Sequence, residues 1–291
     1  WFKNLKNILS GYEGMIFTDV DAAEILPQEM QAEEDAGSFI GEDVIANTMP
    51  LPEYGKAWQQ SFSASSLQQY NICQRSFYYH YILQMPPVEP QLNGENVIDA
   101  RTFGTLVHEA LEKYAGNVKK ALMQAAYDNN LQDYDLSEAE KMLEEYLQSN
   151  LYPGLEAKQL HETGFTLPVL AKYGINAQCY GFIDNIIYNS DGSLSIIDYK
   201  TGHVPDALPK GYKYQLALYK LAAEEMFNLP VKNAELHFLR GCVSFELPAD
   251  FNPEEIAAEL QSIFAKTDER EFTCSTAYCH SCPYAYFCKK I

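Results

Sequence analysis

The chain has 291 residues, 47% of them hydrophobic, and a formal net charge of -19. This size and composition allow a sizeable buried core, while the acidity argues against a broad, non-specific surface for nucleic acid. No segment is apolar over the length that crosses a bilayer, and the start lacks the pattern of a signal peptide, so no membrane span is predicted and a cytoplasmic location is expected.

Residues 1–60 differ from the rest of the chain. They hold eleven Asp or Glu against three Lys, show no sustained periodicity and end in the turn-rich Met49-Pro50-Leu51-Pro52. We interpret them as an acidic tail or linker from a preceding domain, although a disordered segment fits the same pattern, and we interpret residues 61–291 as one domain. Because the chain begins with Trp1 and not with Met, we expect it to be a piece of a longer protein or a processed chain.

Helical patterns come first within the predicted domain. Ser65 and Ser66 are suitable N-caps for a helix that continues through Phe77, and Pro86-Pro87 and Pro90 then open a loop. Two more helices are predicted at residues 102–114 and 137–151.

The hydrophobic period then shortens towards two, which is typical of strands. Strands are predicted at residues 164–171, 177–188, 194–200, 231–239 and 243–247. Helices are predicted between and after them, at residues 213–226 and 253–264. This order of elements predicts a mixed α/β domain.

Two aspartates and a lysine stand in otherwise apolar strands and form the sharpest feature of the sequence. Asp184 ends the run Gly181-Phe182-Ile183-Asp184, and the returning strand contains Ile196-Ile197-Asp198-Tyr199-Lys200. If the hairpin is centred on Asp191, Asp184 falls opposite Asp198, with Cβ atoms about 4.5–5.5 Å apart, and Lys200 shares that face. Like charges opposite each other destabilise a sheet, so a cation between them would explain the arrangement.

Two carboxylates and an ammonium that converge on one point fit phosphodiester hydrolysis. Oxygen ligands suit Mg²⁺ or Mn²⁺, and such a metal activates a water and clamps the scissile phosphate. The ammonium can orient the water or offset charge in the transition state. A plain Asp–Lys pair on a half-exposed hairpin fits the same residues, so the hairpin alone leaves both interpretations open.

Three further polar residues lie on predicted helices. His108 lies off the apolar stripe of its helix, and Gln215 and Tyr219, four residues apart, project from one face of theirs. Glutamine can donate to a phosphate or a base, and tyrosine can donate its hydroxyl. Taken alone, each of the three also fits an ordinary surface or packing role.

Seven cysteines, an odd number in a chain expected in the cytoplasm, argue against a disulfide framework. Four of them lie in the last eighteen residues, where Cys279, Cys282 and Cys288 have the spacing C-x2-C-x5-C. A closed metal site needs a fourth ligand, for which Cys73 is the best candidate and Cys274 the second. Four thiolates could hold either Zn²⁺ or a [4Fe–4S] cluster, and buried thiols that bind no metal are the alternative.

With these motifs in this order, the chain resembles the iron–sulfur group of RecB-like PD-(D/E)xK nucleases, which includes the C-terminal nuclease domain of AddB. The likeness covers residues 63–290. The run that ends in Cys73 resembles the entry motif with its first cluster cysteine, and Cys279, Cys282 and Cys288 resemble the C-terminal cluster triplet.

The same resemblance implies roles for the remaining site residues. Asp184 and Asp198 look like the two metal-binding aspartates, and His108 looks like the histidine that helps to bind the metal. Lys200 looks like the catalytic lysine of the (D/E)xK element. Gln215 and Tyr219 match the QxxxY motif, which contacts DNA or orders the site.

The resemblance implies a restriction-endonuclease-like core, with a central mixed sheet flanked by helices and both ends of the domain joined by the iron–sulfur cluster. It implies a Mg²⁺- or Mn²⁺-dependent DNA exonuclease of double-strand-break repair and recombination. The expected partners are DNA, an upstream helicase-like domain of the same chain and a separate helicase–nuclease protein. Two alternatives remain: a stand-alone iron–sulfur exonuclease of CRISPR adaptation, and a non-catalytic scaffold that binds DNA or a partner.

Overall fold

The computed structural model describes residues 59–87, 98–269, 272–275, 277, 279–280, 282–285 and 288. The predicted acidic segment, residues 1–60, lies outside the described residues except for its last two positions. Among the helices that the structure describes, none combines the length and the apolar character needed to cross a membrane.

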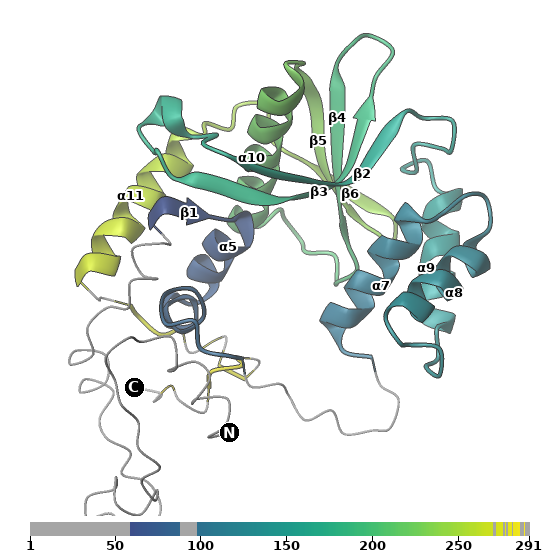
Figure 1. Cartoon of the computed structure of the whole chain (residues 1–291), viewed down its shortest axis with the longest axis horizontal. Coiled ribbons are helices and arrows are strands. Elements are labelled where there is room, and N and C mark those ends of the chain that lie inside the picture. Colours follow the sequence, from purple (N-terminus) through teal and green to yellow (C-terminus); the bar gives the residue numbers. More distant parts are fainter. Residues whose placement is uncertain are drawn as a thin grey trace, which may run out of the picture. The chain divides into compact units, whose positions relative to one another are not determined.

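A mixed sheet of six strands forms the centre of the described domain (Figure 1). Five strands follow the order β1-β3-β4-β5-β6, and β2 also pairs with β3. The β1–β3 and β4–β5 pairs are parallel, and the other pairs are antiparallel. The strands are β1 (Ser61–Phe62), β2 (Gln159–Leu167), β3 (Gln178–Tyr188), β4 (Leu194–Lys200), β5 (Val231–Phe238) and β6 (Val243–Glu246).

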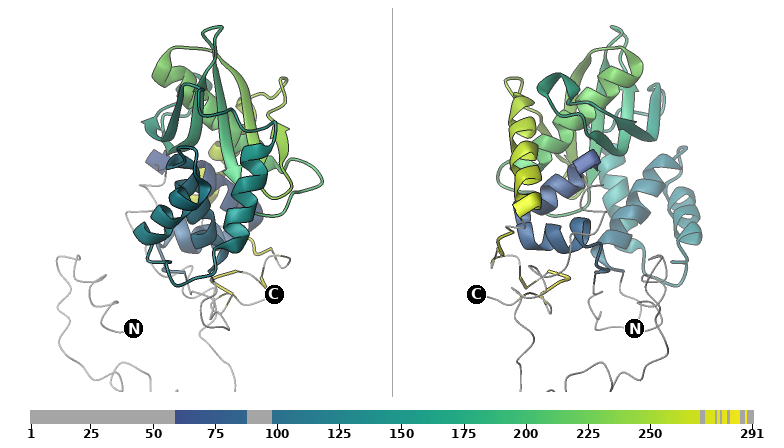
Figure 2. Two further views of the ribbon diagram at one scale, coloured as in Figure 1. Left: turned by 90° about the vertical axis from the view of Figure 1, so that its right-hand side faces the viewer. Right: turned by 60° about the vertical axis from the view of Figure 1, so that its left-hand side comes forward.

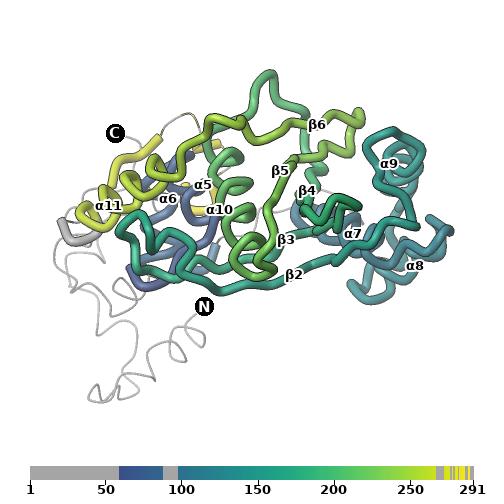
Figure 3. Tube along the Cα trace, turned by 90° about the horizontal axis from the view of Figure 1, so that it is seen from above, coloured from purple at the N-terminus to yellow at the C-terminus, as the bar shows by residue number. Residues whose placement is uncertain are grey.

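Helices flank the sheet in two groups, and each group has its own apolar core (Figures 2 and 3). The first group comprises α5 (Ala64–Ile72), α6 (Gln74–Phe77), a π-helix (Tyr78–Ile82), α10 (Lys210–Phe227) and α11 (Glu254–Glu269). The second group comprises α7 (Ala100–Glu112), α8 (Val118–Asp128) and α9 (Ser137–Gln148). Since β4 and β5 are parallel, α10 supplies the crossover between them. The predicted α/β class, with a mixed central sheet flanked by helices, is confirmed.

Helix α7 shows how the sequence pattern orients an element. Its apolar residues recur every three or four positions and are buried against α8, α9 and the sheet. Asp99 caps the helix, because its carboxylate accepts hydrogen bonds from the N–H groups of Arg101 and Thr102. The buried stripe consists of Leu106, Val107, Ala110 and Leu111.

The first predicted helix is shorter than expected. Ser63 is the N-cap, and not Ser65 or Ser66, because the side chains of Ser63 and Ser66 each accept a hydrogen bond from the other's backbone N–H. The helix stops at Cys73, whose extended backbone (φ -159°, ψ 112°) separates α5 from α6. The prediction of one continuous helix through Phe77 is therefore wrong.

Three other elements differ from the predictions. Helix α8 was not predicted, and neither was β1, which has only two residues. Strand β2 begins at Gln159, before the predicted start at residue 164, and ends at Leu167. Pro168 follows, and residues predicted as strand instead enter a 3-10 turn at Ala171–Tyr173, because proline has no N–H for a ladder.

The beginning and the end of the described domain are joined directly. The Arg75 N–H donates to the Thr273 carbonyl at 3.0 Å, and the rings of Tyr78 and Phe272 stack with centroids 4.7 Å apart. The Tyr284 hydroxyl donates to the Met85 carbonyl at 3.0 Å. These contacts link residues about two hundred positions apart and place the C-terminal cysteines beside the end of α5.

Candidate active site

The β3–β4 hairpin has the register that the sequence predicts. Asn185 pairs with Ile197 and Ile186 with Ile196, and this register, continued by one residue, puts Asp184 opposite Asp198. Pairing between the strands stops at Asn185 and Ile197. The two aspartates therefore stand where the strands separate, between the side chains of α7 and α10.

Asp184 is held by the neighbouring strand and by helix α7. Its Oδ2 accepts a hydrogen bond from the Tyr199 N–H at 2.7 Å. His108 Nδ1 lies 3.4 Å from the same oxygen. Because the buried stripe of α7 fixes that helix, the imidazole at the edge of the stripe is directed to β3. The structure thus brings the predicted residues His108 and Asp184 together.

Asp198 is 2% exposed, and its two oxygens have different surroundings. Oδ1 accepts a hydrogen bond from Gln215 Nε2 at 2.8 Å. Oδ2 forms an ion pair with the Lys200 ammonium, with 2.5 Å between Oδ2 and Nζ. A buried carboxylate is costly unless cations and donors satisfy it, and each oxygen of Asp198 has a single neighbour of that kind. Both oxygens therefore keep a lone pair that could bind a metal ion.

Glu162, on β2, is a site residue that the sequence reasoning missed. One ligand atom each from His108, Glu162 and Asp184 lie within 4.8 Å of one another. Glu162 has a φ of 45°, a left-handed conformation that costs a non-glycine residue about 1–2 kcal/mol. The first residues of β2 are polar and lack the apolar alternation of a strand, so the predicted strand began only at residue 164. In the sequence, Glu162 was therefore only an acidic residue ahead of a predicted strand.

Burial and neighbouring carboxylates shift the pKa values of the candidate metal ligands. Burial, and then the charge of Asp198, raise the pKa of Asp184 well above its usual value. Burial lowers the pKa of His108, which keeps its ring neutral and free to bind a metal. Burial also raises the pKa of Glu162, and the nearby Glu112 adds to this shift. Crowded carboxylates of this kind favour a divalent cation among them.

Gln215 and Tyr219 lie behind the carboxylates, on α10. Both side chains are buried, and Gln215 Nε2 donates to the Tyr219 hydroxyl at 3.1 Å as well as to Asp198 Oδ1. Of the two roles implied for the QxxxY motif, this placement favours the ordering of the site. The pair holds Asp198 from the side opposite to His108.

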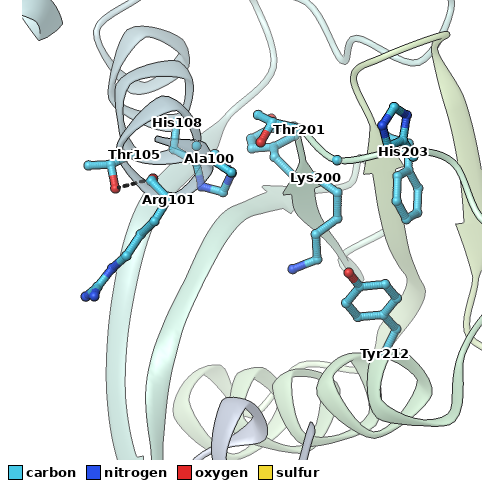
Figure 4. A pocket seen from close by; sticks show the side chains of 12 residues that line it. Ala100, Arg101, Thr105, His108, Lys200, Thr201, His203 and Tyr212 are labelled. Carbon is cyan, nitrogen blue, oxygen red and sulfur yellow. Dashed lines mark hydrogen bonds between the residues drawn. The ribbon is translucent and has the colours of Figure 1, made fainter. Parts of the chain in front are cut away.

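A pocket of about 430 Å³ opens beside Lys200 (Figure 4). Arg101 and His108 border it from α7, and Lys200 and Tyr212 border it from the other side. The Lys200 ammonium lies 5.2 Å from the centre of the Tyr212 ring. The pocket therefore presents the cations of Arg101 and Lys200 close to the carboxylate site, although the whole chain is acidic.

The structure brings Cys274, the second candidate for the fourth ligand, together with two of the predicted ligands, Cys279 and Cys288. The Cys274 Sγ lies 3.8 Å from the Cys279 Sγ and 3.5 Å from the Cys288 Sγ. The Cys73 Sγ accepts a hydrogen bond from the Ser275 N–H at 3.4 Å. Among the described residues, no sulfur contact of this kind reaches Cys282, whose role as a ligand stays a prediction.

Comparisons relate the chain to known proteins. The family model of the PD-(D/E)XK nuclease superfamily matches residues 61–289. A segment of 97 residues is 35% identical to an ATP-dependent helicase/nuclease protein of Moorella thermoacetica, and it makes up 33% of this chain but only 6% of that protein. A crystal structure of SSO0001 covers 76% of this chain and 96% of its own, with 16% sequence identity and a TM-score of 0.34.

Proposed function

Since this chain belongs to the PD-(D/E)XK nuclease superfamily, we propose that it is a deoxyribonuclease that uses Mg²⁺ or Mn²⁺ to hydrolyse phosphodiester bonds. The observation that carries the proposal is the convergence of ligand atoms from His108, Glu162 and Asp184 within 4.8 Å of one another. Asp198, paired with Lys200, stands opposite Asp184. A structural Asp–Lys pair on a half-exposed hairpin would not need further ligands beside it, and its aspartate would not be buried.

The residues at this point fit a divalent metal ion. His108, Asp184 and Asp198 would hold it through one imidazole nitrogen and carboxylate oxygens, and Glu162 adds a further carboxylate. Such an ion would supply Lewis acidity towards the phosphate and would lower the pKa of a bound water. This ligand set of hard oxygens and a single nitrogen matches the preference of Mg²⁺ and Mn²⁺.

Lys200 would meet the phosphate as a cation. Burial opposes the charge on its ammonium, but the Asp198 and Asp184 carboxylates together outweigh burial and raise the pKa of Lys200. The ammonium therefore stays protonated at neutral pH, and it can orient the attacking water and offset negative charge as the phosphate reacts. Asp198 in turn keeps its orientation through Gln215, which is held by Tyr219.

The biological setting is a further part of the proposal. We propose that the domain acts as an exonuclease in double-strand-break repair and recombination, in the cytoplasm, together with a helicase–nuclease protein. The similarity of 97 residues to a helicase/nuclease protein supports this setting. An upstream helicase-like domain in the same chain and the division into residues 1–60 and 61–291 belong to the same proposal.

The cysteines are proposed to hold a [4Fe–4S] cluster, with Cys73, Cys279, Cys282 and Cys288 as ligands. Support comes from the thiols that the structure brings together near the junction of the two ends of the domain. Zn²⁺ remains the alternative occupant. The Sγ–Sγ distances of 3.5 and 3.8 Å, which run from Cys274 to Cys288 and Cys279, are close to the edge of a tetrahedron with 2.3 Å metal–sulfur bonds, about 3.8 Å, and would suit Zn²⁺ with Cys274 as a ligand.

The nuclease is tested with the anaerobically purified chain and end-labelled single-stranded and duplex DNA in Mg²⁺, Mn²⁺ or EDTA. Cleavage is expected with metal only, and Lys200→Ala should lower kcat about a hundredfold or more because it removes a charge that acts in the transition state. Lys141→Ala is the matched control, since this lysine is exposed on α9. Full activity of Lys200→Ala would contradict the mechanism, and binding without cleavage would favour the scaffold.

A further inference from the structure

Two large aromatic side chains stand exposed on β3 just before Asp184. Phe182 is 63% exposed and Tyr180 is 40% exposed. Their strand partners are Gly164 and Thr166 on β2, in regular antiparallel pairing. Because residues two apart in a strand share a face, the two rings form one aromatic surface on the sheet, which we call the β3 platform.

The β3 platform lies on the side of the sheet from which α7 delivers His108. Gly181, between the two aromatic residues, faces the ring of Tyr219 on α10. Tyr180 and Phe182 must therefore point to the opposite face of the sheet. On that face α7 packs against Tyr199. The rings and the imidazole thus approach the carboxylates from the same side.

The ring of Phe182 lies against a glycine of the neighbouring strand. A Cβ atom at Gly164 would lie 3.0 Å from Phe182 Cε1, 3.4 Å from Cδ1 and 3.6 Å from Cζ, so the ring rests on the bare backbone of β2. This contact restrains the ring, which still remains largely exposed. Packing on Gly164 accounts for the position of the Phe182 ring. Tyr180 pairs with Thr166 and not with a glycine, so this packing does not account for its exposed ring.

The spacing of Asp184, Phe182 and Tyr180 along β3 suits the spacing of successive nucleotides in an unpaired DNA strand. Phe182 is two residues from Asp184, about 7 Å, and Tyr180 is about 7 Å further. Aromatic side chains in a row beside a basic pocket are the usual means of holding successive unpaired bases.

We propose that the β3 platform stacks bases of an unpaired DNA strand while the neighbouring phosphate lies at Asp184. This inference rests on the proposed nuclease function and names its substrate as a single strand. In a duplex the base faces are already stacked and cannot reach the rings. A chain with a net charge of -19 gains little from long-range attraction to phosphates, so base stacking should carry a large share of the binding.

The test measures binding separately from cleavage. Fluorescence anisotropy of a labelled oligothymidine and of a matched duplex is recorded in EDTA with the whole chain, together with the fluorescence of a 2-aminopurine base in the oligonucleotide. Phe182→Ala should weaken single-strand binding about tenfold, and Tyr180→Ala somewhat less, because one stacked base is lost in each. Stacking should quench the 2-aminopurine in the wild type and not in Phe182→Ala.

Variants of the same position and of a distant one complete the test. Phe182→Trp should restore binding and quenching, whereas Phe182→Leu, apolar but not aromatic, should not. Tyr127→Ala removes a 65% exposed aromatic residue from α8 and should change neither. Wild-type binding by both Phe182→Ala and Tyr180→Ala, or an equal loss for duplex, would overturn the platform. Cleavage of DNA by the wild type would then still stand, so the two proposals can fail separately.

Discussion

At the scale of single residues, the site is defined by buried carboxylates that lie close together, so that the charge of one disfavours the ionised form of another when no metal is bound. Asp184 shows this most clearly, because both burial and the charge of Asp198 disfavour its ionised form. A divalent cation needs the ionised form, so proton and metal exclude each other at this side chain.

The stabilisation by metal should therefore depend on pH. The folded-state pKa of Asp184 lies above its unfolded value, so in metal-free protein this group stabilises the fold at low pH and loses that contribution as pH rises through the raised pKa. The gain in Tm with saturating Mn²⁺ should be small near about pH 5 and should grow towards about pH 8. Scanning calorimetry of wild type and Asp184→Asn would show this, and the growth should be absent in the variant. An equal gain at every pH would count against metal binding at Asp184.

Glu162 allows a second prediction at this scale. Glu162→Gln keeps the shape of the side chain and removes its charge beside His108 and Asp184, so the affinity for Mn²⁺ should fall about tenfold. Titration calorimetry with EDTA-stripped protein measures the affinity, and Glu145→Gln, on the exposed surface of α9, serves as the control. An unchanged Mn²⁺ affinity would mean that Glu162 is only a neighbour of the metal.

At the scale of elements, the sequence was most informative where the pattern was local and apolar. Strand β4 and the stripe of α7 follow directly from hydrophobic spacing, and the turn around Asp191 set the register that places Asp184 opposite Asp198. These features made most of the site predictable. Helix α8 was missed because its buried face is largely alanine, which gives a weak apolar signal.

Elements whose geometry is set by distant partners were not predictable. The extended backbone at Cys73 breaks a helix that its own sequence favours, and it is accompanied by a hydrogen bond from Ser275 to the cysteine sulfur. Glu162 likewise joins the site only through the pairing of β2 with β3. Contacts of this kind depend on residues far apart in sequence, which hydrophobic periodicity does not report.

At the scale of the whole molecule, the proposed cluster predicts which thiols matter. Cys282→Ser should lose iron and the brown colour and should lower the Tm by about 5 °C or more, since metal binding contributes to folding stability. Cys274→Ser should keep its iron. Metal analysis and absorbance spectra test this, with Cys242→Ser, outside the thiol group, as the control. The reverse pattern would make Cys274 the fourth ligand, as its sulfur contacts allow.

The contact between the two ends of the domain also bears on how the chain folds during synthesis. Tyr78 stacks on Phe272, and Arg75 bonds to Thr273, although nearly two hundred residues separate the partners. The ribosome adds nearly two hundred residues after the π-helix before these partners are synthesised, so the aromatic side chains of the π-helix cannot make this contact until then. Closing so long a loop costs conformational entropy before the contact forms and stabilises the fold. We therefore expect the two ends of the domain to join late in folding.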